Sequence, residues 1–260
     1  MSDLRVTLVQ SRLQWHDADA NRKRFALQLA KLAGKTDLVV LPEMFTTGFT
    51  MDAPRYAESM DGPSIEWMRG QAHSLGATVT GSMIIEEKGS FYNRLIWMSP
   101  DGAYRCYDKR HLFRMANEHH HYAAGNHRLI VELNGWRVCP LVCYDLRFPV
   151  WSRNRDDYDL LIYVANWPKR RSHHWRTLLL ARAIENLSYV AAINRVGADG
   201  NEIDYSGDSA IISPMGERLA TLAESEAVVT LALSEQALNH YRERFPAGRD
   251  ADDFTLADRP

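Results

Sequence analysis

The chain has 260 residues, a formal net charge of −2 at pH 7 and an apolar share of 45%. A chain of this size can bury a core without disulfides or metal ions. Its charge produces no global basic field, so we expect neither a nucleic acid nor a membrane as a partner. No apolar run approaches the ~18 residues of a membrane span, and the N-terminal residues show no secretory signal. Three cysteines at no disulfide-framework spacing predict a reducing, cytoplasmic location.

Short apolar runs along the chain predict strands. The expected strands cover residues 6–10, 37–41, 78–85, 137–143, 159–165, 189–194, 209–213 and 228–233, with a hairpin around the turn at 100–102. Segments of helical periodicity lie between these runs, and the alternation predicts an α/β fold with a single domain over residues 1–246. The Pro-, Gly- and Asp-rich residues 247–260 are expected to form a C-terminal tail.

Four helices are predicted from capping residues and apolar spacing. The first follows a cap at Asp17 or Asp19 and ends at Gly34, the second follows a cap at Ser64 and ends at Gly76, the third follows a cap at Ser172 and continues to Leu187, and the fourth covers residues 236–244. Apolar residues nearly surround the third helix, so we expect it to be well buried. A further helix fits between residues 143 and 159, where Pro149 suits a first helical position.

Three polar residues follow apolar runs directly. Glu43 comes after Leu-Val-Val-Leu-Pro, Lys109 follows the strand-like residues 103–107, and Cys143 ends the run that begins at residue 137. Taken singly, each has a plain structural interpretation as a loop carboxylate, a solvated basic turn or a small buried hydrophobe. Because all three follow strand-like runs, a joint catalytic role is the alternative.

Together, the three side chains could carry out nucleophilic attack on a carbonyl group. A free thiol titrates near pKa ~8.5, so it needs a base to become a nucleophile at neutral pH. The carboxylate of Glu43 can take the proton of Cys143, and the ammonium of Lys109 can stabilise the oxyanion formed when sulfur attacks a carbonyl. A Cys–His pair is the usual arrangement, and ten histidines are available. None of them follows a buried strand as Glu43 does.

Three segments carry a family resemblance. Residues 41–49 (LPEMFTTGF), 107–113 (YDKRHLF) and 143–149 (CYDLRFP) resemble, in order and spacing, the signature segments of the nitrilase, or carbon–nitrogen hydrolase, superfamily. The resemblance extends from the first strand to about Pro246. It implies an αββα four-layer sandwich, a homodimer formed through outer helices, and catalysis without a metal or organic cofactor.

The resemblance also implies roles for four residues. Glu43 would be the general base, Lys109 the stabiliser of the tetrahedral intermediate and Cys143 the nucleophile. A second glutamate of the family precedes a glycine in the loop after the lysine, and Glu118 occupies that place before Gly125. The usual Phe-x-Pro-Gly ending of that loop is Tyr-Ala-Ala-Gly here.

The residues after Cys143 indicate the branch of the superfamily. True nitrilases have Trp-Glu after the cysteine, whereas Tyr-Asp-Leu-Arg-Phe-Pro at 144–149 resembles the amidase branch. Residues 107–118, 158–168 and 181–186 are most similar to the omega-amidases of bacteria, which act on 2-oxoglutaramate and 2-oxosuccinamate. Two alternatives stay open: another amidase or carbamoylase, acting on deaminated glutathione or an N-carbamoyl amino acid, and a non-catalytic binding protein of the same fold.

Substrate contacts are predicted near the nucleophile. Arg147 could clamp the substrate's carboxylate bidentately, or it could pair with an internal acid such as Asp145 or Glu185. Arg114 is a second candidate for the same contact. The following residues would wall a small dry pocket, unless they belong to the core: Phe45, Phe113, Met115, Tyr144 and Trp167.

Two other clusters suggest metal or redox chemistry. The segment 111–127 contains five histidines and invites a zinc site, but three consecutive histidines cannot all point one way on a helix or strand. Cys139 and Cys143 are four residues apart, which is not the spacing of a Cys-x-x-Cys redox pair. We therefore expect no metal ion and interpret Cys139 as a packing residue.

Overall fold

The computed structural model describes residues 2–256, and strands in this part of the chain form two six-stranded sheets and a small two-stranded ribbon. The first sheet consists of β1 (Leu4–Gln10), β2 (Leu38–Val40), β3 (Thr78–Glu87), β4 (Ser90–Met98), β5 (Tyr104–Asp108) and β14 (Ala227–Leu233). Their spatial order is β14-β1-β2-β3-β4-β5. The strands β1, β2 and β3 are mutually parallel, and the outer strands pair antiparallel.

The second sheet has the same plan. It consists of β6 (Val131–Leu133), β7 (Trp136–Val142), β8 (Leu160–Ala165), β9 (Tyr189–Asn194), β12 (Ala210–Ile212) and β13 (Arg218–Thr221) in the order β13-β12-β9-β8-β7-β6. Its central strands β7, β8 and β9 are parallel. The separate ribbon pairs β10 (Val196–Ala198) with β11 (Asp204–Ser206).

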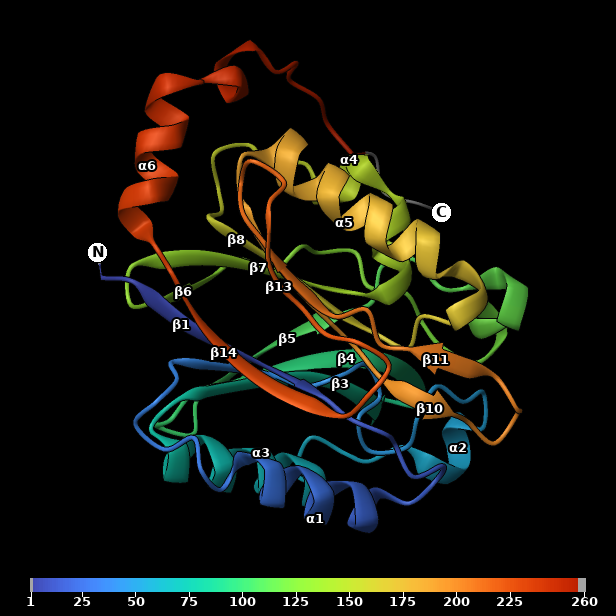
Figure 1. Ribbon diagram of the computed structural model, residues 1–260. Helices are drawn as coiled ribbons and strands as arrows, with labels where there is room; N and C mark the ends of the chain where they lie inside the picture. Colours follow the sequence, from blue (N-terminus) through green and yellow to red (C-terminus); the bar gives the residue numbers. More distant parts are fainter. Residues whose placement is uncertain (1, 257–260) are drawn as a thin grey trace.

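Helices cover the outer face of each sheet. The helices are α1 (Ala18–Leu29), α2 (Ala53–Tyr56), α3 (Pro63–Leu75), α4 (Pro149–Ser152), α5 (Ser172–Asn186) and α6 (Glu235–Arg244). Figure 1 shows α1 and α3 against the first sheet and α5 against the second, with the two sheets stacked between them. The predicted αββα sandwich is therefore confirmed. Within residues 2–256, every helix falls short of the length and hydropathy that crossing a bilayer would need.

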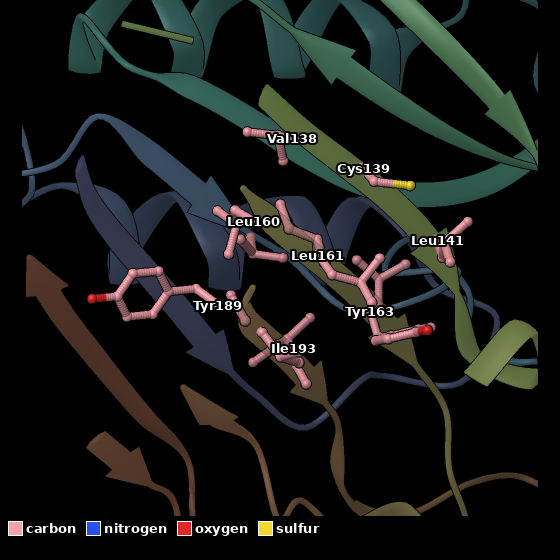
Figure 2. Close-up of a cluster of buried hydrophobic side chains, with 14 of the residues drawn as sticks. Val138, Cys139, Leu141, Leu160, Leu161, Tyr163, Tyr189 and Ile193 are labelled. Carbon is pink, nitrogen blue, oxygen red and sulfur yellow. The ribbon is translucent and has the colours of Figure 1, made fainter. Parts of the chain in front are cut away.

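The core fills the space on both faces of the second sheet. Every residue of β8 and β9 is buried, as is usual for parallel strands covered on both sides. Figure 2 shows part of this cluster, including Val138, Cys139, Leu141, Leu160, Leu161, Tyr163, Tyr189 and Ile193. Burial raises the pKa of Cys139 to about 12, so this thiol stays protonated and packs as a small apolar group.

Two helix boundaries differ from the prediction. The first helix ends at Leu29, not at Gly34, because two turns replace its last helical turn. The second helix begins at Pro63 with Gly62 as its N-cap, so the predicted cap at Ser64 is wrong. Both the backbone N–H and the hydroxyl of Ser64 donate to the carboxylate of Glu58.

The third predicted helix differs in its start and its burial. It begins at Ser172, whose hydroxyl donates to Asp208, and the preceding residue Arg171 is the N-cap. Trp175 and Leu179 face the core, but Ile184 is 50% exposed, so the expectation of a well-buried helix is wrong for one face. Between β7 and β8 the predicted helix is the short α4, and the short strands β6, β10, β11 and β13 were not predicted. The predicted tail includes a 3₁₀ turn, Ala247–Asp250, and its last residues, 257–260, lie outside the described part.

Candidate active site

Three predicted residues come together, each in the turn after a strand. Glu43 lies shortly after β2, while Lys109 and Cys143 directly follow β5 and β7. The Nζ atom of Lys109 lies 2.9 Å from Oε1 of Glu43, across 66 residues of sequence. Lys109 and Cys143 line the same cavity, and Glu43 acts electrostatically on the thiol. The fold therefore brings the carboxylate of Glu43, the ammonium of Lys109 and the thiol of Cys143 to one site.

The carboxylate of Glu43 is fully buried and held at both oxygens. Oε1 accepts hydrogen bonds from Lys109 Nζ and from Asn93 Nδ2, the latter at 2.8 Å. Oε2 accepts a hydrogen bond of 2.8 Å from the backbone N–H of Asn166, which follows β8. The Asn166 side chain also donates to the backbone carbonyl of Glu43, at 2.5 Å. Both sheets thus fix the position of this carboxylate.

Glu118 lies directly behind Lys109. Both of its carboxylate oxygens are 3.0 Å from Lys109 Nζ, and Oε2 also accepts a hydrogen bond from the backbone N–H of Phe113. Burial would lower the pKa of Lys109, but the carboxylates of Glu118 and Glu43 outweigh it and raise that pKa. Burial also raises the pKa of Glu118, against the opposing effect of Lys109. Lys109 is therefore an ammonium held between two buried acids.

Gly125 closes the loop that carries Glu118. A Cβ atom at this position would lie 2.1 Å from the backbone oxygen of Asp108. The N–H of Gly125 donates to the backbone oxygen of Lys109, at 3.0 Å. The loop can return to the strand end that carries Lys109 because the residue there is glycine.

Cys143 opens a 3₁₀ turn, Cys143–Arg147, at the end of β7. Its φ of 44° lies in the left-handed region, which costs about 1–3 kcal/mol for a residue with a side chain. Burial and then the carboxylate of Glu43 raise the pKa of the thiol well above its usual value. The resting group is therefore a thiol, and a base must accept its proton before the sulfur can attack.

The thiol opens into a cavity of about 510 Å³. Of the residues expected to contact substrate or wall the pocket, the cavity is lined by Phe113, Met115, Tyr144, Arg147 and Trp167. Arg114 is exposed and is not among the lining residues. Phe45 does not line the cavity either, because it is fully buried in the core against Phe25 and Trp67.

Arg147 lies on the cavity wall. Its guanidinium stacks over the ring of Trp167 at 4.9 Å, and Nη2 lies 3.0 Å from Nδ1 of His174. The acids weighed as internal partners are engaged elsewhere: Asp145 with His111, and Glu185 with Arg182. Among the described residues, Arg147 forms no ion pair with either of them. Its charge is therefore available to the cavity.

Within residues 2–256, no group of three or more histidine, cysteine or acidic side chains is arranged to hold a metal ion. Of the histidines in segment 111–127, His111 binds Asp145, and the rings of His119 and His120 contact each other at a tilt of 37°, with their centroids 3.9 Å apart. These histidines therefore take part in packing and hydrogen bonding within the fold.

The model of the family described as carbon-nitrogen hydrolase matches residues 5–243. The chain belongs to the carbon–nitrogen hydrolase family. The match includes both sheets and the segments that carry Glu43, Lys109 and Cys143.

Relatives of this carbon–nitrogen hydrolase are similar over their whole length. It is 52% identical to a protein of Escherichia coli (strain K12) named omega-amidase YafV, covering 98% of this chain and 100% of the relative. It is 32% identical to the 2-oxoglutaramate amidase of Bacillus subtilis (strain 168), covering 94% and 96%. A solved CN-hydrolase superfamily protein from Xanthomonas campestris, with an arsenic adduct in its active site, has a TM-score of 0.98 at 53% identity and covers 99% and 100%. The resemblance noted in the sequence is confirmed.

Sequence reasoning missed several residues of the hydrolase site. Asn93 was not singled out, although a polar residue in the mostly apolar run of β4 requires a buried partner. Asn166 was noted only as part of a similar segment. No sequence pattern indicated another part of the cavity wall, because its segments meet only in the folded chain. This part is formed by Trp15, His16 and the hairpin residues 199–205.

Proposed function

We propose that this carbon–nitrogen hydrolase is an omega-amidase, which hydrolyses the terminal amide of 2-oxoglutaramate, and of 2-oxosuccinamate, to the 2-oxo dicarboxylate and ammonia. The observation that carries the proposal is a buried Glu43–Lys109 pair beside Cys143, in a cavity that also presents Arg147. A guanidinium suits the carboxylate at the far end of such a substrate. The names of the relatives from E. coli and B. subtilis support the same substrate class.

Catalysis would proceed through a thioester. Glu43 takes the proton of Cys143 as the sulfur attacks the amide carbon, and the oxyanion is held by Lys109 and a backbone N–H such as that of Tyr144. Glu43 then gives the proton to the leaving nitrogen, and ammonia departs. Water activated by Glu43 attacks the thioester, the carbon–sulfur bond breaks, and the acid product and the thiol are released. No metal or organic cofactor enters this cycle.

The other predicted residues would bind and position. Glu118 would orient Lys109 and the attacking water. Phe113, Tyr144 and Trp167 would form the apolar walls that keep the acyl chain away from bulk water. The geometry offers no support for a substrate contact by Arg114, which is exposed.

A homodimer and a cytoplasmic location are part of the proposal. The half-exposed Ile184 lies on the outer helix α5, where a second copy could cover it. All three cysteines are free thiols, which suits a reducing compartment. Sedimentation of the wild type and of Ile184→Glu checks the dimer, since a charge at a buried interface would give monomers.

Ammonia release from competing amides tests the substrate. We expect 2-oxoglutaramate to be preferred to glutamine, asparagine, deaminated glutathione and N-carbamoyl amino acids. A clear preference for glutamine would contradict the proposal that the substrates are amides of 2-oxo acids. Cys143→Ala should abolish ammonia release from every amide, and undiminished release would overturn the mechanism.

A further inference from the structure

A second guanidinium lines the same cavity as Arg147. Arg171 belongs to the 3₁₀ turn Lys169–Arg171 that precedes α5, and its side chain lies over the ring of Phe113 at 5.2 Å. The backbone oxygen of Arg171 accepts a hydrogen bond of 2.8 Å from Nε1 of Trp167, the residue on which Arg147 stacks. One tryptophan thus positions both arginines on the cavity wall.

The guanidinium of Arg171 has no counter-ion among the described residues. Two other cations of its segment are engaged: Lys169 pairs with Glu224 at 2.8 Å, and Arg176 lies 3.8 Å from Asp208. The neighbouring Arg170 also lines the cavity, but unlike Arg171 it is exposed to solvent. Asp199, an acid that lines the cavity, accepts hydrogen bonds from the Tyr205 hydroxyl and from two backbone N–H groups of its own loop.

Arg171 is half-buried, and its surroundings disfavour its charge. Burial and the neighbouring cations Arg170 and Arg147 lower the pKa of the guanidinium, which nevertheless stays protonated. Two like charges on one partly apolar cavity wall repel each other, and a bound anion relieves that repulsion. A carboxylate suits both arginines, because a guanidinium group binds its two oxygens in a planar fork.

We propose that Arg171 is a second carboxylate-binding residue, which together with Arg147 holds the anionic end of the substrate and restricts the enzyme to amides of acids that carry a free carboxylate. This inference rests on the proposed omega-amidase function and deepens it. Arg147 lies four residues after the nucleophile, whereas Arg171 comes from a separate turn. The carboxylate is therefore bound by two segments at once.

The test compares a charged and a neutral substrate. The variants are Arg171→Gln, Arg171→Lys and the control Lys169→Gln, which removes an exposed charge from the same turn but does not line the cavity. The substrates are 2-oxoglutaramate and pentanamide, a neutral amide of the same chain length. For 2-oxoglutaramate, Arg171→Gln should lower kcat/KM about 10- to 100-fold, mainly through KM, because one charged hydrogen-bonding group is lost. Its turnover of pentanamide should not change.

Arg171→Lys and the control Lys169→Gln separate the geometry of the guanidinium from the effect of a positive charge in this turn. The kcat/KM of Arg171→Lys for 2-oxoglutaramate should fall between those of the wild type and Arg171→Gln, since an ammonium keeps the charge but cannot form the two parallel hydrogen bonds. The kcat/KM of Lys169→Gln should stay within about twofold of the wild-type value for both substrates. If the wild type prefers 2-oxoglutaramate and Arg171→Gln keeps that preference, the inference is overturned while the proposed function stands. Equal losses on both substrates would give Arg171 a structural role and overturn the inference too. A wild type with no preference for the carboxylate would overturn both.

Discussion

Asp145 Oδ1 lies 2.8 Å from Nδ1 of His111 and 3.0 Å from the backbone nitrogen of the same residue. His111 comes two residues after Lys109, and Asp145 comes two residues after Cys143. The other oxygen of Asp145 accepts from the backbone N–H of Val142 at 3.0 Å, and the carboxylate is fully buried. One buried acid therefore joins the lysine turn of the first sheet to the nucleophile turn of the second.

Asp145→Asn should loosen both turns. An amide nitrogen in place of one carboxylate oxygen leaves buried donors without an acceptor, so the free energy of unfolding should fall by about 1–3 kcal/mol. The value of kcat should fall as well, because Lys109 and Cys143 lose their common anchor. Urea unfolding and ammonia release measure the two effects. Asp61→Asn, at an exposed position, serves as the control, and equal behaviour of the two variants would contradict the prediction.

Glu43→Gln should lower the rate of catalysis and, at the same time, make the thiol of Cys143 more acidic. Loss of the base should lower kcat by about 10²- to 10⁴-fold. The Glu43 carboxylate raises the pKa of Cys143, whereas Lys109 lowers it, so the neutral variant should form its thiolate at a lower pH than the wild type. The pH dependence of alkylation at Cys143 measures this shift. An unchanged or higher midpoint would show that the carboxylate does not act on the thiol.

Lys109→Met should leave two buried carboxylates without their cation. The free energy of unfolding at neutral pH should fall by about 3–5 kcal/mol, as when one partner of a buried pair is removed. Burial already raises the pKa of Glu118, and loss of the ammonium raises it further. An acid with a raised folded pKa favours the folded state below its unfolded pKa of ~4.3 and disfavours it as pH rises through the folded value. The stability deficit should therefore shrink on acidification, and a deficit independent of pH would argue against this account.

Asp159 predicts a pH effect of the opposite sign. Its Oδ1 lies 2.7 Å from Arg137 on β7 and 2.6 Å from Arg242 on α6. Burial would raise the pKa of Asp159, but the hydrogen bonds from Arg137 and Arg242 outweigh it and lower that pKa. The resulting stabilisation is present above the unfolded pKa of ~3.9 and is lost as pH falls through the folded value.

Asp159→Asn should therefore destabilise the protein at neutral pH, by about 2 kcal/mol for charged hydrogen bonds of this kind. The difference from the wild type should close in acid. Urea unfolding at several pH values measures both. Asp156→Asn is the matched control, since Asp156 contacts the same Arg137 at 3.6 Å but is 91% exposed. If the two variants lose the same stability, burial of Asp159 is not the cause.

The sequence, through its strand–helix alternation and its resemblance to the carbon–nitrogen hydrolases, determined the layered fold and the four residues proposed for catalysis. Glu43, Lys109 and Cys143 stand out because each follows an apolar strand, whose end is readable from local hydrophobicity. Their roles came from the resemblance of the three segments that carry them to the carbon–nitrogen hydrolases. The same resemblance assigned Glu118, which precedes Gly125 in the loop after the lysine. These features depend on residues close together in the chain.

Only the tertiary structure decided what surrounds those residues. Asn93 and Asn166 bind Glu43 across 50 and 123 residues of sequence, so no local pattern could reveal them. For the same reason Arg171 reaches the cavity, while Arg114 stays exposed and Phe45 packs into the core. Which side chains share a cavity depends on how distant segments pack, and hydrophobic periodicity carries no information about that packing.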